Sequence, residues 1–216
     1  MTSRSPASTR LPVIGLTGAV GAGKSTAAAA LAGHACRVVD VDAMGHEALR
    51  DGPTRDAVSA RFGKGVLDAG GDVERRTLAS VVFSDRAALR DLEAIVHPRV
   101  AQMVSDALAR PSAAGTRAVV VDCALLFEGG IDAFCDHVIC VSANRATRED
   151  RAAATRGWSR DEFKRREGMQ LPADEKAARA CHVVTNDGDK AELERTVVHI
   201  LEEVISGPPK CGRRRQ

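Results

Sequence analysis

The chain has 216 residues, 44% of them hydrophobic and 28% charged, which excludes a disordered chain or a fibre and predicts one globular domain with room for a small subdomain. Lys and Arg number 31 and Asp and Glu number 29, so the formal net charge is only +2. This balance argues against a broad polyanion-binding surface and hence against a nucleic-acid partner. Any phosphate chemistry must therefore come from a local site.

Arginine and alanine are both in excess, with 25 arginines against 6 lysines and with 36 alanines. Arginine can grip phosphates through its planar guanidinium. A codon bias would raise arginine and alanine together, and it is therefore the favoured explanation for most of these arginines. The chain has five Phe, one Trp and no Tyr, so stacking of nucleic-acid bases on aromatic side chains is not expected.

The six cysteines form no CxxC pair, and several lie in apolar stretches, as small buried hydrophobic residues do. This usage predicts a reducing compartment and a cytoplasmic location.

No run approaches the roughly 20 apolar residues of a membrane span, so no membrane partner is expected. Residues 1–12 predict a disordered leader, for which an organelle transit segment remains an alternative, and residues 206–216 form a basic tail.

The first predicted element is an apolar strand over 11–16, followed by a glycine-rich turn and an alanine-rich helix, the order of a nucleotide-binding unit. Further strands are expected over 37–41, 118–121, 137–141 and 181–185, and an amphipathic helix over 190–205. Helical stretches separate the strands. The pattern therefore predicts a three-layer α/β fold, a parallel sheet covered by helices on both faces, within a domain over 13–205.

Two stretches depart from this alternation of strands and helices. Residues from about 45 to 111 contain helical segments broken by glycines and predict an inserted, mostly helical region without another strand pair. Residues from about 145 to 176 are helical, strongly charged and poor in apolar anchors. That second stretch predicts a mobile flap.

Residues 18–25 read GAVGAGKS, a complete G-x-x-x-x-G-K-[ST] phosphate-binding loop. Its glycines let backbone N–H groups turn inward around phosphate oxygens, and the helix that follows adds its positive N-terminal end. Lys24 can reach the outer phosphates, and the Ser25 hydroxyl can bind magnesium. A turn that merely links strand and helix would not need the only lysine of the first sixty residues. The residues expected to contact nucleotide phosphates are Gly18, Ala19, Val20, Gly21, Ala22, Gly23, Lys24, Ser25 and Thr26.

This loop predicts a nucleoside triphosphate and magnesium but does not indicate the reaction. It leaves open a small-molecule kinase, a GTPase switch, and a motor or binding ATPase. The chain has no N-K-x-D guanine signature, and no D-x-x-G follows the third predicted strand. Both absences argue against a GTPase.

Asp40 and Asp42 flank Val41 at the predicted end of the second strand. Residues two apart in a strand point to the same side, so a carboxylate here could face the phosphate loop from the carboxyl edge of the sheet. A kinase that acts on a hydroxyl needs such a carboxylate to take or orient its proton. Asp42 is the first candidate, whereas capping of the next helix is the alternative role, above all for Asp40.

Five segments together resemble a known family: GLTGAVGAGKST, VVDVDAMGHE, G-x-x-x-R-x-x-L with VVF, LEAIVHPRV and VDCALLFEGG. In this order and at this spacing the chain resembles the dephospho-coenzyme A kinases from about residue 13 to residue 188. The resemblance implies a P-loop nucleoside-triphosphate hydrolase-like core, with the insert as a helical acceptor-binding region and the charged stretch as a helical lid. It implies ATP-dependent phosphorylation of the ribose 3′-hydroxyl of dephospho-coenzyme A, the last step of coenzyme A biosynthesis.

The same resemblance implies roles for single residues. Its catalytic residues would be Asp42, which acts on the acceptor hydroxyl, together with Lys24 and Arg151. The acceptor would contact Asp42, His46, Arg75, His97 and Leu125, and ATP would also contact Arg151 and Asn186. For His97 and Pro98 a helix interruption is an equal alternative, because proline disfavours helical geometry in the residue before it. Gln170, Lys176 and Gly188 also match the family.

Asp122 closes the third apolar run, where a P-loop enzyme keeps a carboxylate that orients magnesium through water. Glu128 could point into the same cleft, and no role is favoured for it.

Four positions depart from the family pattern: Ala124 replaces a proline, Arg148 replaces a lid glutamine, Thr155 replaces a lid arginine, and Cys181 replaces the aspartate of an Ala-Asp pair. These changes concern the lid contacts and leave the phosphate loop and Asp42 intact.

Two other functions stay open for this sequence. One is another P-loop kinase of nucleosides or nucleotides, and the other is a regulator that binds ATP without catalysis. The sequence leaves the oligomeric state open, with a monomer favoured. The expected partners are ATP, magnesium and dephospho-coenzyme A.

Overall fold

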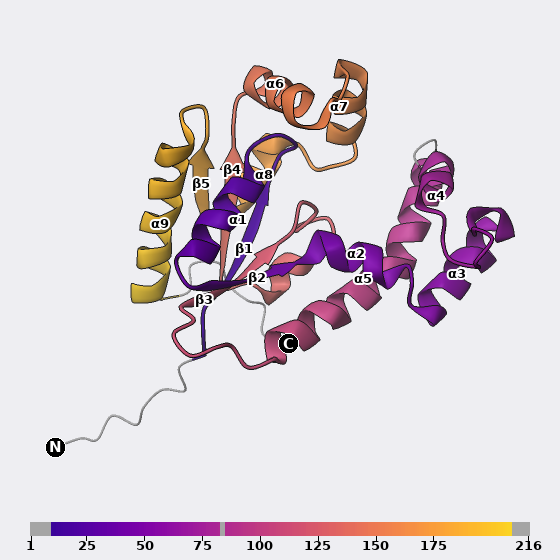
Figure 1. Ribbon diagram of the computed structural model, residues 1–216, viewed down its shortest axis with the longest axis horizontal. Helices are drawn as coiled ribbons and strands as arrows, with labels where there is room; N and C mark the ends of the chain where they lie inside the picture. The colour runs from indigo at the N-terminus through magenta and orange to yellow at the C-terminus, as the bar shows by residue number, and fades with distance from the viewer. Residues whose placement is uncertain (1–9, 83–84, 209–216) are drawn as a thin grey trace. The chain divides into compact units, whose positions relative to one another are not determined.

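The computed structural model describes residues 10–82 and 85–208 (Figure 1). The chain divides into two compact units, of which unit 1 comprises residues 1–39 and 112–216 and unit 2 comprises residues 40–111. Unit 2 contains the predicted insert but begins at Asp40 instead of at about residue 45.

Unit 1 is built on a five-stranded sheet in the order β2-β3-β1-β4-β5. Strand β1 pairs in parallel with β3 and β4, and β4 pairs in parallel with β5. The strands are β1 Val13–Gly18, β2 Cys36–Asp40, β3 Ala118–Asp122, β4 His137–Ser142 and β5 His182–Thr185. The predicted strands thus lie in place, with ends within two residues of those observed.

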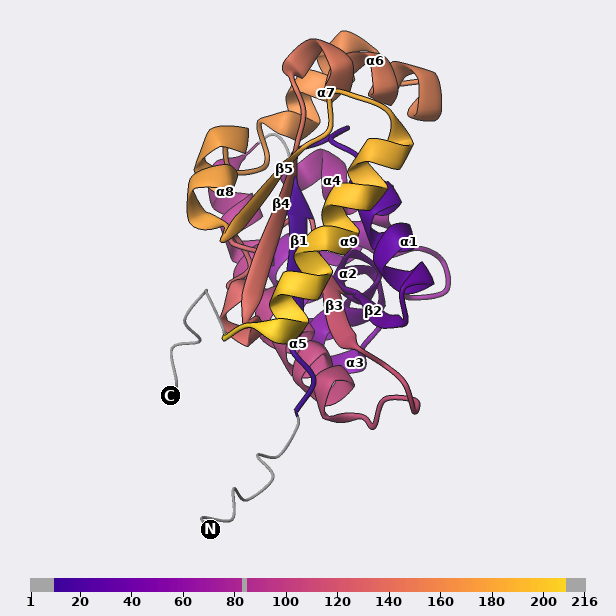
Figure 2. The same ribbon diagram turned by 90° about the vertical axis from the view of Figure 1, so that its left-hand side faces the viewer.

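Both faces of this sheet are covered by helices. Residues of α1 (Lys24–Gly33) and α9 (Lys190–Ser206) share one buried apolar cluster with β1, β3 and β4. Helix α8 (Ala173–Arg179) contacts β1 and β4, and Figure 2 shows it on the other side of the sheet from α1 and α9. This burial explains why every residue of β1 is apolar or small and buried. The predicted α/β fold and the predicted final helix are confirmed.

Unit 2 is helical, as predicted for the insert. It contains α2 (Val41–Ala48), α3 (Gly52–Phe62), α4 (Arg75–Val82), α5 (Arg86–Ala109) and the short 3-10 helix η1 (Lys64–Val66). Its core includes Val58, Val66 and Leu78. Helix α5 runs through Pro98 without a break, which excludes the helix interruption that was one of two alternatives for His97 and Pro98. The packing of one face of α5 in this unit outweighs the local cost of proline.

The stretch 145–176 is helical, as predicted, and it has apolar anchors that its composition does not reveal. It forms α6 (Arg145–Arg156), α7 (Arg160–Glu167) and the start of α8. Phe163 and Ala152 are buried in a cluster with Val20 of the phosphate loop, and Trp158 packs against them. A few well-placed apolar residues therefore fix these helices to the core of unit 1, and the proportion of charged residues does not reveal them.

The start of the described chain is tied to the sheet, although it belongs to the predicted leader. The guanidinium of Arg10 pairs with the carboxylate of Asp136 at 3.1 Å, and the same carboxylate accepts the N–H of Val13 at 2.9 Å. Pro12 accepts a backbone hydrogen bond from Val119. Order in unit 1 thus begins before β1. The rest of the predicted leader, residues 1–9, lies outside the described residues.

Buried thiols bear out the interpretation of several cysteines as small hydrophobic residues. Cys36, Cys123, Cys135 and Cys140 are buried and do not form disulfides. Burial raises the pKa of Cys140 to about 11, so its thiol stays protonated and unreactive at neutral pH. Within the described ranges, no helix is long and apolar enough to cross a membrane.

One fully buried lysine connects the turn after β3 to the segment that leads into α8. The ammonium of Lys176 donates to the carbonyl of Ala124 at 2.6 Å and to Gln170 Oε1 at 3.0 Å, and it lies 3.1 Å from Glu128 Oε1. Glu128 Oε1 also accepts the N–H of Leu171. A buried charge needs such compensation, and so Lys176 and Glu128 have a structural role.

We predict that Lys176→Met lowers the free energy of unfolding by about 3–5 kcal/mol, because it leaves the Glu128 carboxylate without its cation. Urea denaturation measures the loss. The matched control is Lys190→Met on α9, where the lysine side chain is 73% exposed and lies 3.4 Å from Glu194. That exposed pair should contribute less than about 1 kcal/mol. If both variants lose the same free energy of unfolding, the buried pair contributes no more to stability than the exposed pair.

Candidate active site

The phosphate loop connects β1 to α1, as the sequence predicts. Gly21 and Gly23 have positive φ angles of 76° and 101°, and Ala22 donates its N–H to the carbonyl of Ala19 at 3.0 Å. Lys24 is the first residue of α1, and the first turn of that helix contains no acidic residue. The loop therefore ends at a helix N-terminus whose partial positive charge is not offset by a neighbouring carboxylate of the same turn.

The glycines of this loop are required by close approaches of other backbone segments. A Cβ atom at Gly18 would lie 2.5 Å from the carbonyl oxygen of Val141 on β4. At Gly21 it would lie 2.5 Å from the carbonyl oxygen of Arg148 on α6, and at Gly23 it would collide with the side chain of Asn186. At Gly18 and Gly21 no larger residue fits unless the backbone moves, and at Gly23 a larger residue would displace the Asn186 side chain and be strained by the positive φ angle. The loop is therefore held closely by β4, α6 and the turn after β5.

Lys24 and Asp122 form an ion pair beneath the loop. Lys24 Nζ lies 2.7 Å from Asp122 Oδ1, and the two side chains are 19% and 15% exposed. Asp122 is the last residue of β3, where the register places it beside Leu16 of β1. The carboxylate thus lies at the carboxyl end of the strand, as predicted, and its observed partner is the lysine of the loop.

Asn186 supports the loop from the turn after β5. Its side-chain Nδ2 donates to the carbonyl of Ala22 at 2.7 Å, and its own carbonyl accepts from Arg151 Nη1 at 2.8 Å. The side chain is buried against the phosphate loop instead of being directed outward toward a base. Asn186 thus contacts the loop directly, and Arg151 contacts it through Asn186.

Asp40 and Asp42 do not share one strand, which corrects the predicted alternation. Strand β2 ends at Asp40, and Asp42 lies in the first turn of α2, where it is exposed. Asp40 caps this helix, because its side chain accepts the N–H of Ala43 at 2.9 Å. The capping role expected of Asp40 is confirmed. Asp42 keeps its carboxylate on the helix surface instead of at a strand tip.

Unit 2 contains a pocket of about 870 Å³ with charged walls. The predicted acceptor residues His46 and Arg75 both line it, and Arg75 Nη2 lies 2.7 Å from His46 Nε2. Asp42 precedes His46 by one helical turn, so the two side chains lie on the same face of α2. His97 is not among the lining residues. The predicted acceptor residue Leu125 belongs to unit 1, in the turn after β3.

Sequence reasoning missed the other residues of this pocket, whose charged members are Glu47, Arg50, Asp51, Asp68, Asp72 and Arg99. Arg99 pairs with Asp51 at 3.1 Å. A helical spacing could have indicated Arg50, which follows His46 by four residues on the adjoining helix end. No comparable signal marks Arg99, because its role depends on how α5 packs within unit 2.

The pocket favours neutral His46. Because a guanidinium has only N–H donors, Arg75 must donate to Nε2, and the imidazole proton is then on Nδ1. Partial burial, and then the positive charge of Arg75, lower the pKa of His46 below its ordinary value of 6.5, against an opposing effect of Asp42. Since folding disfavours the charged form, His46 makes stability fall as the pH drops from 6.5 toward the folded pKa.

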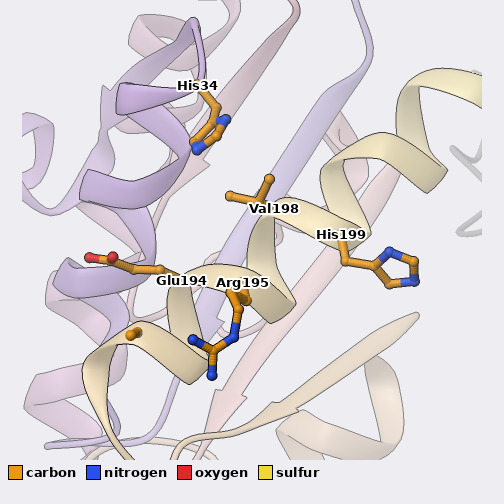
Figure 3. Close-up of a pocket in the computed structure, with 6 residues that line it drawn as sticks. His34, Glu194, Arg195, Val198 and His199 are labelled. Carbon is orange, nitrogen blue, oxygen red and sulfur yellow. The ribbon is translucent and has the colours of Figure 1, made fainter.

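A second pocket, of about 500 Å³, lies in unit 1 beside α1 and α9 (Figure 3). It is lined by His34, Glu194, Arg195, Val198 and His199, among others. Figure 3 shows the ring of His199 and the guanidinium of Arg195 pointing in different directions. None of the predicted site residues lines this pocket, and its charged groups do not converge on one point.

The departures from the family pattern have structural explanations at two positions. Residue 124 contributes its carbonyl oxygen, which accepts from Lys176 and from the Thr17 hydroxyl, and alanine supplies that oxygen as well as proline would. The Thr155 hydroxyl donates to the carbonyl of Arg151 at 2.6 Å within α6. The contacts of Arg148 are described below.

We predict that the NMR titration of His46 has a midpoint below 6.5, and that Arg75→Ala raises it, because this variant removes a neighbouring positive charge. The Hε1 resonance of His46 provides the measurement. Arg76→Ala is the matched control on the same helix, since Arg76 does not contribute to the shift. A midpoint that is the same in wild type and in Arg75→Ala would contradict the contact.

Comparisons with known proteins agree with this geometry. The family model described as dephospho-CoA kinase matches residues 12–192. The dephospho-CoA kinase of Anaeromyxobacter dehalogenans is 39% identical over 196 residues, which cover 90% of this chain and 93% of the relative. That of Geobacter sulfurreducens is 37% identical over 189 residues, 87% of this chain and 96% of the relative.

A crystal structure of a Thermus thermophilus protein superposes with a TM-score of 0.77 at 36% identity, covering 90% of this chain and 98% of that one. The fold is therefore that of the P-loop kinases. The family model spans both units and all the segments that carried the resemblance. The chain belongs to the dephospho-CoA kinase family.

Proposed function

We propose that this protein transfers the γ-phosphoryl group of ATP to the ribose 3′-hydroxyl of dephospho-coenzyme A, which gives coenzyme A and ADP and completes coenzyme A biosynthesis. The observation that carries the proposal is the phosphate loop, with Lys24 held at its end by Asp122. Family membership supports the acceptor. The unit 2 pocket offers Arg50 and Arg75 to an acceptor that carries phosphate groups, although four carboxylates also line it, so the acceptor assignment rests on family membership.

On the donor side, the backbone N–H groups of the loop and the N-terminus of α1 bind the β- and γ-phosphates. Lys24 neutralises the charge that shifts toward the leaving ADP oxygen during transfer. Asp122 holds the lysine through the 2.7 Å contact and limits the motion of its long side chain. The loop therefore provides a preorganised anion site before ATP arrives.

Magnesium fits the same end of the sheet. The Ser25 hydroxyl is exposed on the first turn of α1, and the Asp122 carboxylate ends β3 near the lysine of that turn. Hydroxyl and carboxylate oxygens are the ligands that magnesium prefers, and kinase sites supply few of them besides the nucleotide phosphates. Bound with ATP, the ion would neutralise phosphate charge. Ser25 would hold it directly and Asp122 through water.

On the acceptor side, Asp42 takes or orients the proton of the attacking hydroxyl. Asp42 is exposed on α2, and the Asp40 carboxylate accepts the N–H of Ala43 at the helix end. Neutral His46 can donate through Nδ1 while Arg75 fixes its ring. Arg151 of the lid stabilises the charge on the transferred group, and its remaining N–H groups are available for that role.

We predict that dephospho-coenzyme A gives ATP-dependent ADP release well above the rate without acceptor. A coupled ADP assay measures it, with adenosine, other nucleosides and nucleoside monophosphates as competing acceptors. A preference for one of those would replace the acceptor assignment with another kinase. Tight ATP binding without turnover on any acceptor would favour a regulator instead.

We predict that Asp42→Asn lowers kcat by about 10²- to 10⁴-fold while ATP affinity persists, because the amide cannot accept the hydroxyl proton. Steady-state kinetics and calorimetry measure the two quantities. Asp40→Asn is the matched control, since asparagine caps a helix as well as aspartate does and should leave kcat nearly unchanged. If both variants lose activity equally, or if neither does, Asp42 is not the acceptor base.

A further inference from the structure

Arg148 is a buried charge next to the phosphate loop, at a position where the family has a glutamine. Its side chain is 6% exposed. Nε donates to the carbonyl of Ala143 at 3.1 Å, and Nη1 donates to the carbonyl of Val20 at 3.2 Å and to Glu167 Oε1 at 2.7 Å. The guanidinium also lies over the ring of Phe163, 5.6 Å from its centre.

The contact with Val20 determines the direction of a phosphate-binding N–H. The peptide bond is planar and trans, so the carbonyl of one residue and the N–H of the next point in opposite directions. A guanidinium that holds the Val20 carbonyl therefore turns the Gly21 N–H away from itself. Asn186 acts in the same way on the Ala22 carbonyl, and so on the Gly23 N–H. Two donors of the loop are thus oriented from outside.

We propose that Arg148 is a positioning residue for the phosphoryl donor. It holds the Val20–Gly21 peptide so that the Gly21 N–H faces the phosphates of ATP, and it connects this peptide to α7 through Glu167. The inference deepens the proposed function and rests on it for the identity of the nucleotide. Through Arg148, helix α6 would contribute to ATP binding although the Arg148 side chain does not contact ATP.

Only a guanidinium can make this set of contacts. Arginine offers five N–H donors in a rigid fork, and here the fork binds three acceptors on three segments. Glutamine has two N–H donors on one nitrogen, and lysine lacks the planar geometry. The charge is compensated by Glu167, which Arg145 also contacts at 3.3 Å. The close approach of the Arg148 carbonyl to Gly21 adds a second contact between α6 and this peptide.

The experiment measures ATP binding by calorimetry without acceptor, and then the kinetics with dephospho-coenzyme A. Arg148→Gln should weaken ATP binding about tenfold and lower kcat/KM for ATP at least as much, since one charge-assisted hydrogen bond to the loop is lost. KM for the acceptor should stay unchanged. Arg148→Lys should not restore binding, because the lysine keeps the charge but not the fork.

Two further variants separate positioning from stability. Arg160→Gln, in the same lid with a side chain that is 92% exposed, should bind ATP as wild type does. Glu167→Gln should weaken ATP binding less than Arg148→Gln does, and it serves in place of Arg148→Gln if that variant does not fold. A lowered melting temperature with unchanged ATP affinity would overturn the proposal, as would full rescue by Arg148→Lys.

The two proposals fail in different ways. If wild type binds ATP but does not phosphorylate dephospho-coenzyme A, the proposed function is wrong and the Arg148 variants still decide the inference through ATP binding. If wild type turns over dephospho-coenzyme A and Arg148→Gln binds ATP equally well, the inference alone is wrong. Wild type without ATP affinity would overturn both.

Discussion

Two carbonyl oxygens of the phosphate loop are bound by side chains that lie outside the loop, and several segments of unit 1 approach the loop to make these contacts. Val20 is held by Arg148 and Ala22 by Asn186. Because a carbonyl and the following N–H are opposed, these contacts leave the N–H groups free to converge on an anion. The loop must then be approached closely on several sides. Its glycines are the positions where that approach leaves no room for a Cβ atom.

Several buried charges around the loop serve geometry more than stability. Lys24 pairs with Asp122, Lys176 with Glu128 and Arg148 with Glu167. The attraction within such a pair offsets little more than its desolvation cost, so the pair adds little to the stability of the fold. Loss of one partner is strongly destabilising, because the other charge is then buried alone. Asp122 and Glu128 both lie at or after the carboxyl end of β3. The segment where a P-loop enzyme keeps its metal carboxylate is therefore also the anchor for two lysines that come from distant parts of the chain.

The sequence predicts the positions of the strands well, but it does not predict which residues anchor the lid to the phosphate loop. The apolar runs identify all five strands. Strands β1, β3 and β4 are buried along almost their whole length and are therefore apolar, whereas β5 alternates buried and exposed residues. The anchoring contacts of the lid could not be predicted, because Phe163 and Ala152 pack onto Val20, which lies far away in the chain. The prediction that Asp40 and Asp42 share a strand fails because the Asp40 side chain begins a helix one residue earlier than the alternation allows. At Pro98, tertiary packing outweighs a local preference.

The arginines of the lid differ in what compensates their charge, and this difference favours Arg151 as the group that meets the transferred phosphoryl. Arg145 and Arg148 share Glu167, and Arg165 and Arg166 share Glu162. Arg156 and Arg166 both lie over the ring of Trp158. The contact of Arg151 is with the neutral carbonyl of Asn186, which orients the guanidinium without cancelling its charge. A cation that is held in place but not neutralised can stabilise charge that develops on a phosphoryl group, whereas an arginine already paired with a carboxylate would first have to break that pair.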